Sequence, residues 1–207
     1  MERLLFVRVV GQVFEGPIMS SERTVAPPTQ SVADPAPLGL AGFALTTFVL
    51  STVNAGWIPK SGEPVVLGLA FAYGGLAQFC AGMWEFKRNN TFGATAFTSY
   101  GGFWIAFALL VTFNVAGIPA EARPAAVGTF LLAWGIFTAY MTVAATTLSR
   151  PVLVVFILLT ITFFVLAFGA FSSQAGVTVL GGYLGLLTAI AAWYASAITV
   201  IASTRKR

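Results

Sequence analysis

The feature that most constrains this chain is a series of long stretches without charged side chains. The first covers residues 38–58, about 20 residues, which is the length that a helix needs to cross the core of a bilayer. Only 9% of the whole chain is charged, whereas soluble domains carry about 25% charged residues. The surface must therefore face lipid. Continuous apolar runs, rather than short alternating segments, predict an all-α, polytopic membrane protein and exclude a β-barrel.

Six apolar segments are predicted to span the membrane around a central pore: residues 38–57, 64–84, 92–116, 125–148, 152–171 and 177–202. The connections are short, so residues 34–204 are expected to form one transmembrane domain of antiparallel neighbours. Residues 1–33 are predicted to be a disordered cytoplasmic tail, and residues 205–207 a basic cytoplasmic C-terminus. For residues 1–18 two interpretations stay open, a weak interfacial helix or a segment upstream of a true start at Met19.

The basic residues predict the orientation of the helices. With six spans, both termini lie on the same side of the membrane. That side collects nine of the eleven Lys and Arg residues, and the other side has only two, Lys60 and Arg123. The positive-inside rule therefore predicts cytoplasmic termini. The expected location is the cell (cytoplasmic or inner) membrane.

Several kinds of chemistry lack the residues that they need. The chain has no histidine and one cysteine, Cys80. No charged residue lies deep inside a predicted span, and the nearest is Glu85 at the end of the second. A carboxylate proton relay in mid-membrane is therefore not expected, nor is hydrolytic or redox catalysis. The net charge of +4 is scattered at segment ends. We predict a protein that is not an enzyme, needs no cofactor or metal, and contacts lipid rather than nucleic acid.

Neutral polar and aromatic residues remain as candidates for a lined path. The first span carries an aromatic ring, two hydroxyls and an amide on one helical face: Phe43, Thr47, Ser51 and Asn54. Other candidate lining residues are Gln78, Thr98 and Ser99. Polar groups inside a membrane serve either as contacts between helices or as the wall of a water-filled path. The stripe as a whole favours the path.

Several motifs carry a family resemblance. Residues 34–40 read DPAPLGL, residues 73–78 read YGGLAQ, residues 81–87 read AGMWEFK, residues 90–93 read NTFG, and residues 96–101 read AFTSYG. Together with WGIFT at residues 134–138, these resemble the signature patterns of the acetate uptake transporter family, the succinate–acetate permeases. The first motif departs from the family's NPAPLGL at Asp34, where an extra negative charge is expected to weaken anion attraction. The motif's other marked residues, Pro35, Pro37 and Gly39, are expected to be structural.

The resemblance implies a six-helix protomer in a homo-hexamer, each protomer with its own path for acetate and related small carboxylates. It also implies a narrow constriction, which in this chain would be formed by Phe43, Tyr100 and Leu159. The leading hypothesis is thus a channel or transporter for small carboxylates, with succinate among its substrates. Whether transport is coupled to protons stays open. The alternatives are a pore for another small solute, such as ammonia or urea, and a membrane scaffold or sensor without flux.

Overall fold

Residues 32–205 are the part of the chain that the structure, a computed structural model, describes. Six helical segments within it are long and apolar enough to cross a membrane: Ala36–Asn54, Lys60–Lys87, Thr91–Gly117, Arg123–Ala145, Arg150–Ser172 and Ala175–Thr204. The predicted all-α class and six spans are therefore confirmed. The tail predicted for residues 1–33 lies almost entirely outside the described residues.

Four of the six segments are continuous α-helices: α2 (Ala36–Asn54), α6 (Arg123–Ala145), α7 (Arg150–Ser172) and α8 (Ala175–Thr204). The second segment consists of the 3₁₀ turn η1 (Lys60–Gly62), α3 (Pro64–Phe71), the π-helical η2 (Ala72–Ala77) and α4 (Gln78–Lys87). The third consists of α5 (Thr91–Leu109), the π-helical η3 (Leu110–Asn114) and the 3₁₀ turn η4 (Val115–Gly117). Apolar content alone does not predict these π-helical turns, which accommodate an extra residue in the helix.

Five of the helices begin at or next to a proline, or after a side chain that accepts a hydrogen bond from a backbone N–H of the first turn. Prolines occupy the first or second position of α2, α3, α6 and α7, where a backbone N–H would have had no partner within the helix. Helix α5 instead begins after Asn90, whose side chain accepts a hydrogen bond of 3.1 Å from the N–H of Gly93. The first connection turns at Gly56, which has φ of +78°. This turn ends α2 at Asn54, three residues before the predicted end.

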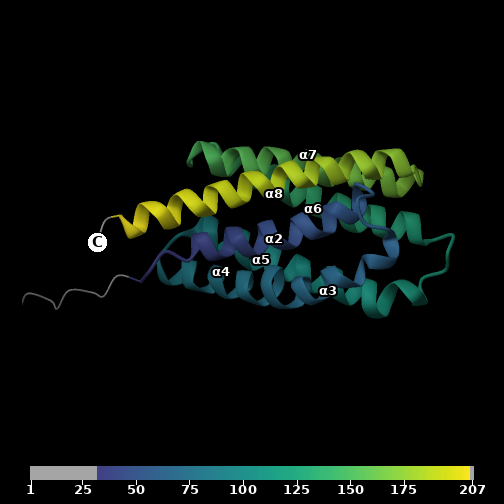
Figure 1. Cartoon of the computed structure of the whole chain (residues 1–207), viewed down its shortest axis with the longest axis horizontal. Helices are drawn as coiled ribbons and strands as arrows, with labels where there is room; N and C mark the ends of the chain where they lie inside the picture. The colour runs from purple at the N-terminus through teal and green to yellow at the C-terminus, as the bar shows by residue number, and fades with distance from the viewer. Residues whose placement is uncertain (1–31, 206–207) are drawn as a thin grey trace, which may run out of the picture. The chain divides into compact units, whose positions relative to one another are not determined.

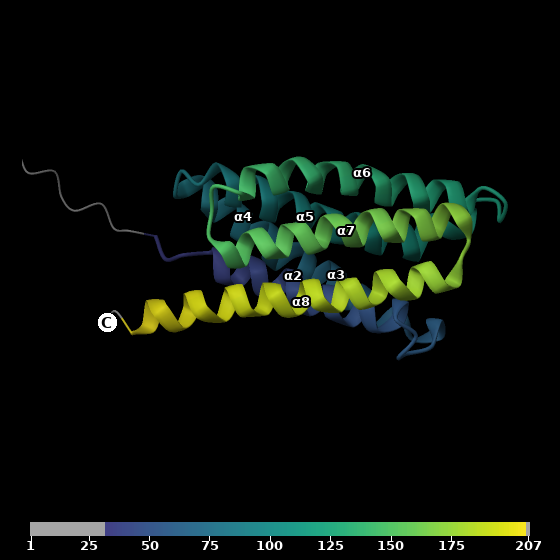
Figure 2. The same ribbon diagram turned by 90° about the horizontal axis from the view of Figure 1, so that it is seen from above.

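Small residues allow the closest contacts between helices. Helix α2 packs along α8, α8 along α7, and α7 along α6 (Figure 1, Figure 2). A Cβ atom added to Gly182 of α8 would lie 2.6 Å from the backbone carbonyl carbon of Asn54. A Cβ added to Gly101 of α5 would lie 2.7 Å from the backbone nitrogen of Phe79 in α4. The backbones can approach this closely only because no side chain stands between them.

Helices α5 and α6, by contrast, meet through aromatic side chains. Phe103 stacks on Phe130 with ring centroids 5.7 Å apart, and it meets Trp134 edge-to-face at 5.1 Å. Tyr100 meets Phe137 edge-to-face at 5.5 Å. Rings of this size hold the two backbones further apart than glycine contacts would. The helix backbones are therefore closely packed among α2, α8 and α7, whereas aromatic rings fill the space between α5 and α6.

The two ends of the bundle differ in what they carry. Helix α2 begins and α8 ends at the same end, at the left of Figure 1, which we call the near end. The opposite, far end holds the connections at residues 55–63, 118–122 and 173–174. Between the ends, large apolar side chains such as Leu76, Val143 and Ile190 are more than half exposed. Apolar surface of this extent is typical of a face that contacts lipid.

Candidate functional site

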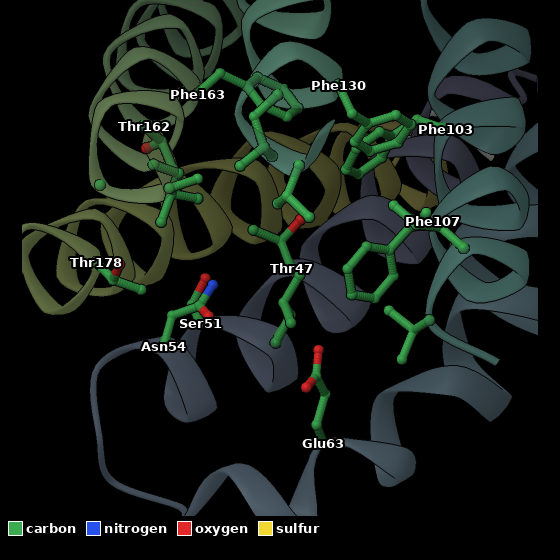
Figure 3. Close-up of a pocket in the computed structure, with 18 of the residues that line it drawn as sticks. Thr47, Ser51, Asn54, Glu63, Phe103, Phe107, Phe130, Thr162, Phe163 and Thr178 are labelled. Carbon is green, nitrogen blue, oxygen red and sulfur yellow. The ribbon is translucent and has the colours of Figure 1, made fainter. Parts of the chain in front are cut away.

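A cavity of about 580 Å³ lies inside the far-end half of the bundle (Figure 3). Its wall is formed by α2, α5, α6, α7 and α8, together with the far-end elements η1, η3 and η4 and Glu63. Phenyl rings make up much of the apolar wall, from Phe103, Phe107, Phe130 and Phe163. Hydroxyl and amide groups make up the uncharged polar part, from Thr47, Ser51, Asn54, Thr162 and Thr178. A mostly apolar wall with a few placed polar groups is typical of a small-molecule site.

The polar stripe predicted on α2 runs along this cavity. All four of its members, Phe43, Thr47, Ser51 and Asn54, line the wall. The hydroxyl of Thr47 is buried and has no hydrogen-bond partner within the described residues. A buried hydroxyl without a partner is uncommon in folded proteins, and this one lies on the helix face that lines the cavity. Contact between these four residues and a transported solute stays a prediction.

Two of the three residues expected at the constriction line the cavity at its inner limit. Phe43 and Leu159 each belong to the wall and are 4% exposed. Tyr100 is not part of the wall. It lies one helical turn before Phe103, the first wall residue of α5, and its ring centroid is 5.7 Å from that of Phe43. These ring contacts continue through Phe156, which lies 6.1 Å from Tyr100 and 5.1 Å from Phe92. An apolar layer several side chains deep therefore separates the cavity from the near end.

The hydroxyl of Tyr100 is fixed in this layer by one hydrogen bond. It lies 3.0 Å from the hydroxyl of Thr138, which is fully buried. The Thr138 hydroxyl has one hydrogen, and it donates that hydrogen to the backbone carbonyl of Trp134 at 2.7 Å. Tyr100 must therefore be the donor to Thr138, and α6 supplies the partner that a buried tyrosine requires.

Replacing Thr138 with valine should destabilise the protein by about 1–2 kcal/mol, because the Tyr100 hydroxyl is left buried without an acceptor. The apparent melting temperature in detergent would measure this loss. The double variant Tyr100→Phe, Thr138→Val removes both polar groups, so it should melt closer to the wild type than Thr138→Val does. Equal melting of the single and the double variant would show that an unpaired Tyr100 hydroxyl costs nothing at this position.

Three other predicted lining residues lie outside the wall of this cavity: Gln78, Thr98 and Ser99. Gln78 is 1% exposed, and its Cβ lies near the Gly42 position of α2. The Thr98 hydroxyl is buried where α5 contacts Gly82 of α4. Gln78 and Thr98 therefore belong to contacts among α2, α4 and α5, and Ser99 is half-buried on α5. Helical periodicity identifies buried faces but does not distinguish a face that packs on a helix from one that lines a cavity.

The DPAPLGL motif joins three elements at the near end. Asp34 accepts a hydrogen bond of 3.0 Å from the N–H of Ala36 and forms an ion pair with Arg88. The hydroxyl of Ser196 in α8 donates to the carbonyl of Pro37 at 2.7 Å. A Cβ on Gly39 would lie within 2.8 Å of the ring of Phe97. The carboxylate expected to repel anions is thus paired with a cation, and the motif anchors the start of α2.

The structure adds two charged residues to the site that the sequence does not predict there. Lys60 in η1 and Glu63, directly before α3, line the cavity at the far end, and the Glu63 carboxylate points inward (Figure 3). The sequence places both in a connection, and only the fold brings that connection over the cavity. The one available signal is that Glu63 precedes a proline-initiated helix, whose first turn fixes its position. Within residues 32–205, no group of three or more His, Cys, Asp or Glu side chains could hold a metal ion.

The sequence and the fold were compared with those of known proteins. Residues 14–206 match the model of the GPR1/FUN34/yaaH family. The chain belongs to this family. Acetate permease A of Emericella nidulans is 46% identical over 177 residues, which are 78% of this chain and 59% of the permease. The succinate-acetate/proton symporter SatP of Escherichia coli is 37% identical over 163 residues, which are 79% of this chain and 86% of SatP. The solved structure of the bacterial acetate channel SatP matches with a TM-score of 0.80 at 36% identity, covering 86% of this chain and 97% of that chain.

One further relative carries a different activity in its name. The ammonia transport outward protein 2 of Saccharomyces cerevisiae is 42% identical over 172 residues, which are 81% of this chain and 61% of that protein. The chain thus spans about three-fifths of the length of these fungal relatives. All four names describe transport, in agreement with the predicted family resemblance and with the prediction that the chain is not an enzyme. With six spans, it is a multi-pass membrane protein of a transport family.

Proposed function

We propose that this protein conducts acetate and related small carboxylates, succinate among them, through the cavity and the aromatic layer beneath it. The main observation behind the proposal is the order in which polar and apolar surroundings follow each other along the path. A polar vestibule with hydroxyl and amide groups ends on Phe43 and Leu159, with Tyr100 immediately behind. Hydroxyls and amides replace part of the hydration of a carboxylate, and a dry aromatic layer then limits the size of what passes.

The orientation and the assembly are part of the same proposal. Lys87, Arg88, Arg150 and Arg205 lie at the near end of the described chain, whereas Lys60 and Arg123 lie at the far end. The positive-inside rule then places the near end, with both termini, in the cytoplasm and makes the cavity an external vestibule in the cytoplasmic membrane. Six protomers would form a homo-hexamer in lipid, each with its own path, as the family resemblance implies. Cross-linking of the protein in membranes would test the number of protomers.

Uptake of labelled acetate into proteoliposomes tests transport directly. Purified protein should give acetate uptake above that of empty vesicles, and excess unlabelled succinate should reduce it. Absence of uptake above empty vesicles, together with a stable complex with another membrane protein, would instead support a scaffold or sensor. Uptake that unlabelled carboxylates do not reduce would refute the proposed substrate class.

Lys60 should increase the capture of anions at the vestibule, because its exposed ammonium group lies at the rim. Replacing Lys60 with glutamine should raise the acetate concentration needed for half-maximal uptake by about twofold at low ionic strength. The difference should disappear at high salt, which screens exposed charges. Lys60→Arg keeps the charge and should behave as the wild type. An effect of Lys60→Gln that is independent of salt would exclude this electrostatic role.

A second candidate is conduction of a small neutral solute. It is favoured by the yeast relative that is named for ammonia transport and by the uncharged polar groups of α2 and α8. Ammonia conduction would alkalinise vesicles loaded with a pH dye, whereas entry of acetic acid would acidify them. The direction of the dye response in the same proteoliposomes therefore distinguishes the two candidates.

A further inference from the structure

The side chain of Glu63 is the one carboxylate among the residues that line the cavity. It is half-buried, and its oxygen atoms point inward between Thr47 and Phe107 (Figure 3). Glu63 is also held in place, because it directly precedes Pro64 at the start of α3, and its backbone carbonyl accepts from the N–H of Val66 at 2.9 Å. A carboxylate therefore lies in the same confined space through which another carboxylate is proposed to pass.

The surroundings of Glu63 contain little that could neutralise it. From η1, Lys60 is the one cation in the wall of the cavity. The α2 residues that face the same space are uncharged, as are those of α5 and η3. Within residues 32–205, the ion pairs both involve Arg88 at the near end, so Glu63 and Lys60 do not form one. Two carboxylates brought together in such a space resist ionising together, and they share a proton instead.

We infer that Glu63 supplies the proton with which acetate enters the aromatic layer, an inference that rests on the proposed function. An ionised acetate could pass the layer at Phe43 and Leu159 only at a high cost of desolvation, whereas neutral acetic acid could pass at a much lower one. The carboxyl groups of a glutamate side chain and of acetic acid are similar in acidity, so a proton moves between them without a large barrier.

The step conserves protons and charge. The O–H bond of protonated Glu63 breaks, an O–H bond forms on an acetate oxygen, and Glu63 is left as a carboxylate. Acetic acid crosses the layer and dissociates at the near end, while Glu63 takes a new proton from the solution at the far end. One acetate and one proton therefore cross together, and no net charge moves.

The test is the pH profile of acetate uptake by wild-type protein and by Glu63→Gln in proteoliposomes, after subtraction of empty vesicles. At pH 7 acetate in solution is almost fully ionised, so Glu63→Gln should take it up about fivefold more slowly than the wild type. At pH 5 much of the acetate is already protonated in solution, so the two proteins should agree within about twofold. Glu63→Asp, which keeps a carboxyl group, should regain part of the uptake at pH 7.

Glu121 provides the matched control. It is an exposed carboxylate at the same end of the bundle that does not line the cavity, so Glu121→Gln should keep the wild-type profile. Equal slowing of Glu63→Gln at both pH values would indicate a structural role, and faster uptake at pH 7 would indicate simple repulsion of anions. Either result overturns the inference. Wild-type protein that gives no uptake above empty vesicles would refute the proposed function itself, and the role of Glu63 with it.

Discussion

Replacing Phe43 with alanine should raise the uptake of succinate about tenfold relative to that of acetate. Phe43 forms the inner limit of the vestibule with Leu159, and its ring packs on that of Tyr100. Truncation to a methyl group would widen the proposed constriction, and a tenfold gain needs the barrier to fall by only about 1.4 kcal/mol. Acetate is the smaller of the two proposed substrates, so its own uptake should change much less.

The control for this experiment is a second phenylalanine of the same helix. Phe48 contacts Trp193 of α8, with ring centroids 5.2 Å apart, and does not line the cavity. Phe48→Ala should therefore keep the wild-type ratio of succinate to acetate. Truncating a buried Phe43 also costs stability, about 3–5 kcal/mol. Phe43→Leu is a milder variant for the case that Phe43→Ala does not elute as a folded species. An unchanged ratio in folded Phe43→Ala or Phe43→Leu would remove Phe43 from the constriction.

Replacing Gly101 with alanine should lower the apparent melting temperature by about 5–10 °C, because the added methyl group would overpack a close helix contact. The new Cβ would lie 2.7 Å from the backbone nitrogen of Phe79 and 2.8 Å from its Cα. Backbone atoms cannot rotate away as a side chain can. Helices α4 and α5 would therefore have to separate.

The neighbouring glycine provides a matched control for the Gly101 variant. A Cβ on Gly102 would meet no atom within 4 Å, so only helix propensity should change there. Gly102→Ala should stabilise the protein by about 0.5–1 kcal/mol. Melting curves of the two purified variants in the same detergent would measure the difference. Similar melting of both variants would show that the α4–α5 contact tolerates a methyl group.

The family resemblance and the observed geometry agree most closely at the proposed constriction. The motif at residues 96–101 places Tyr100 on the third span, and the aligned first span places Phe43. In the fold their rings are in contact, and Thr138 from the fourth span holds the tyrosine hydroxyl. The partner of a buried polar group on another helix follows from the packing of α5 on α6, so no local pattern could predict Thr138 for this role.

The sequence by itself determined the six spans, because the length and apolarity of each segment are local properties that a bilayer selects for directly. It also determined that Phe43, Thr47, Ser51 and Asn54 share one face, since helical periodicity fixes that relation within one element. Only the tertiary structure decided that this face lines a cavity, whereas Gln78 lies in a helix contact and Glu63 points into the same cavity. Those facts depend on which helix or connection lies opposite each residue, and that is fixed by close glycine contacts and aromatic rings between segments far apart in the chain.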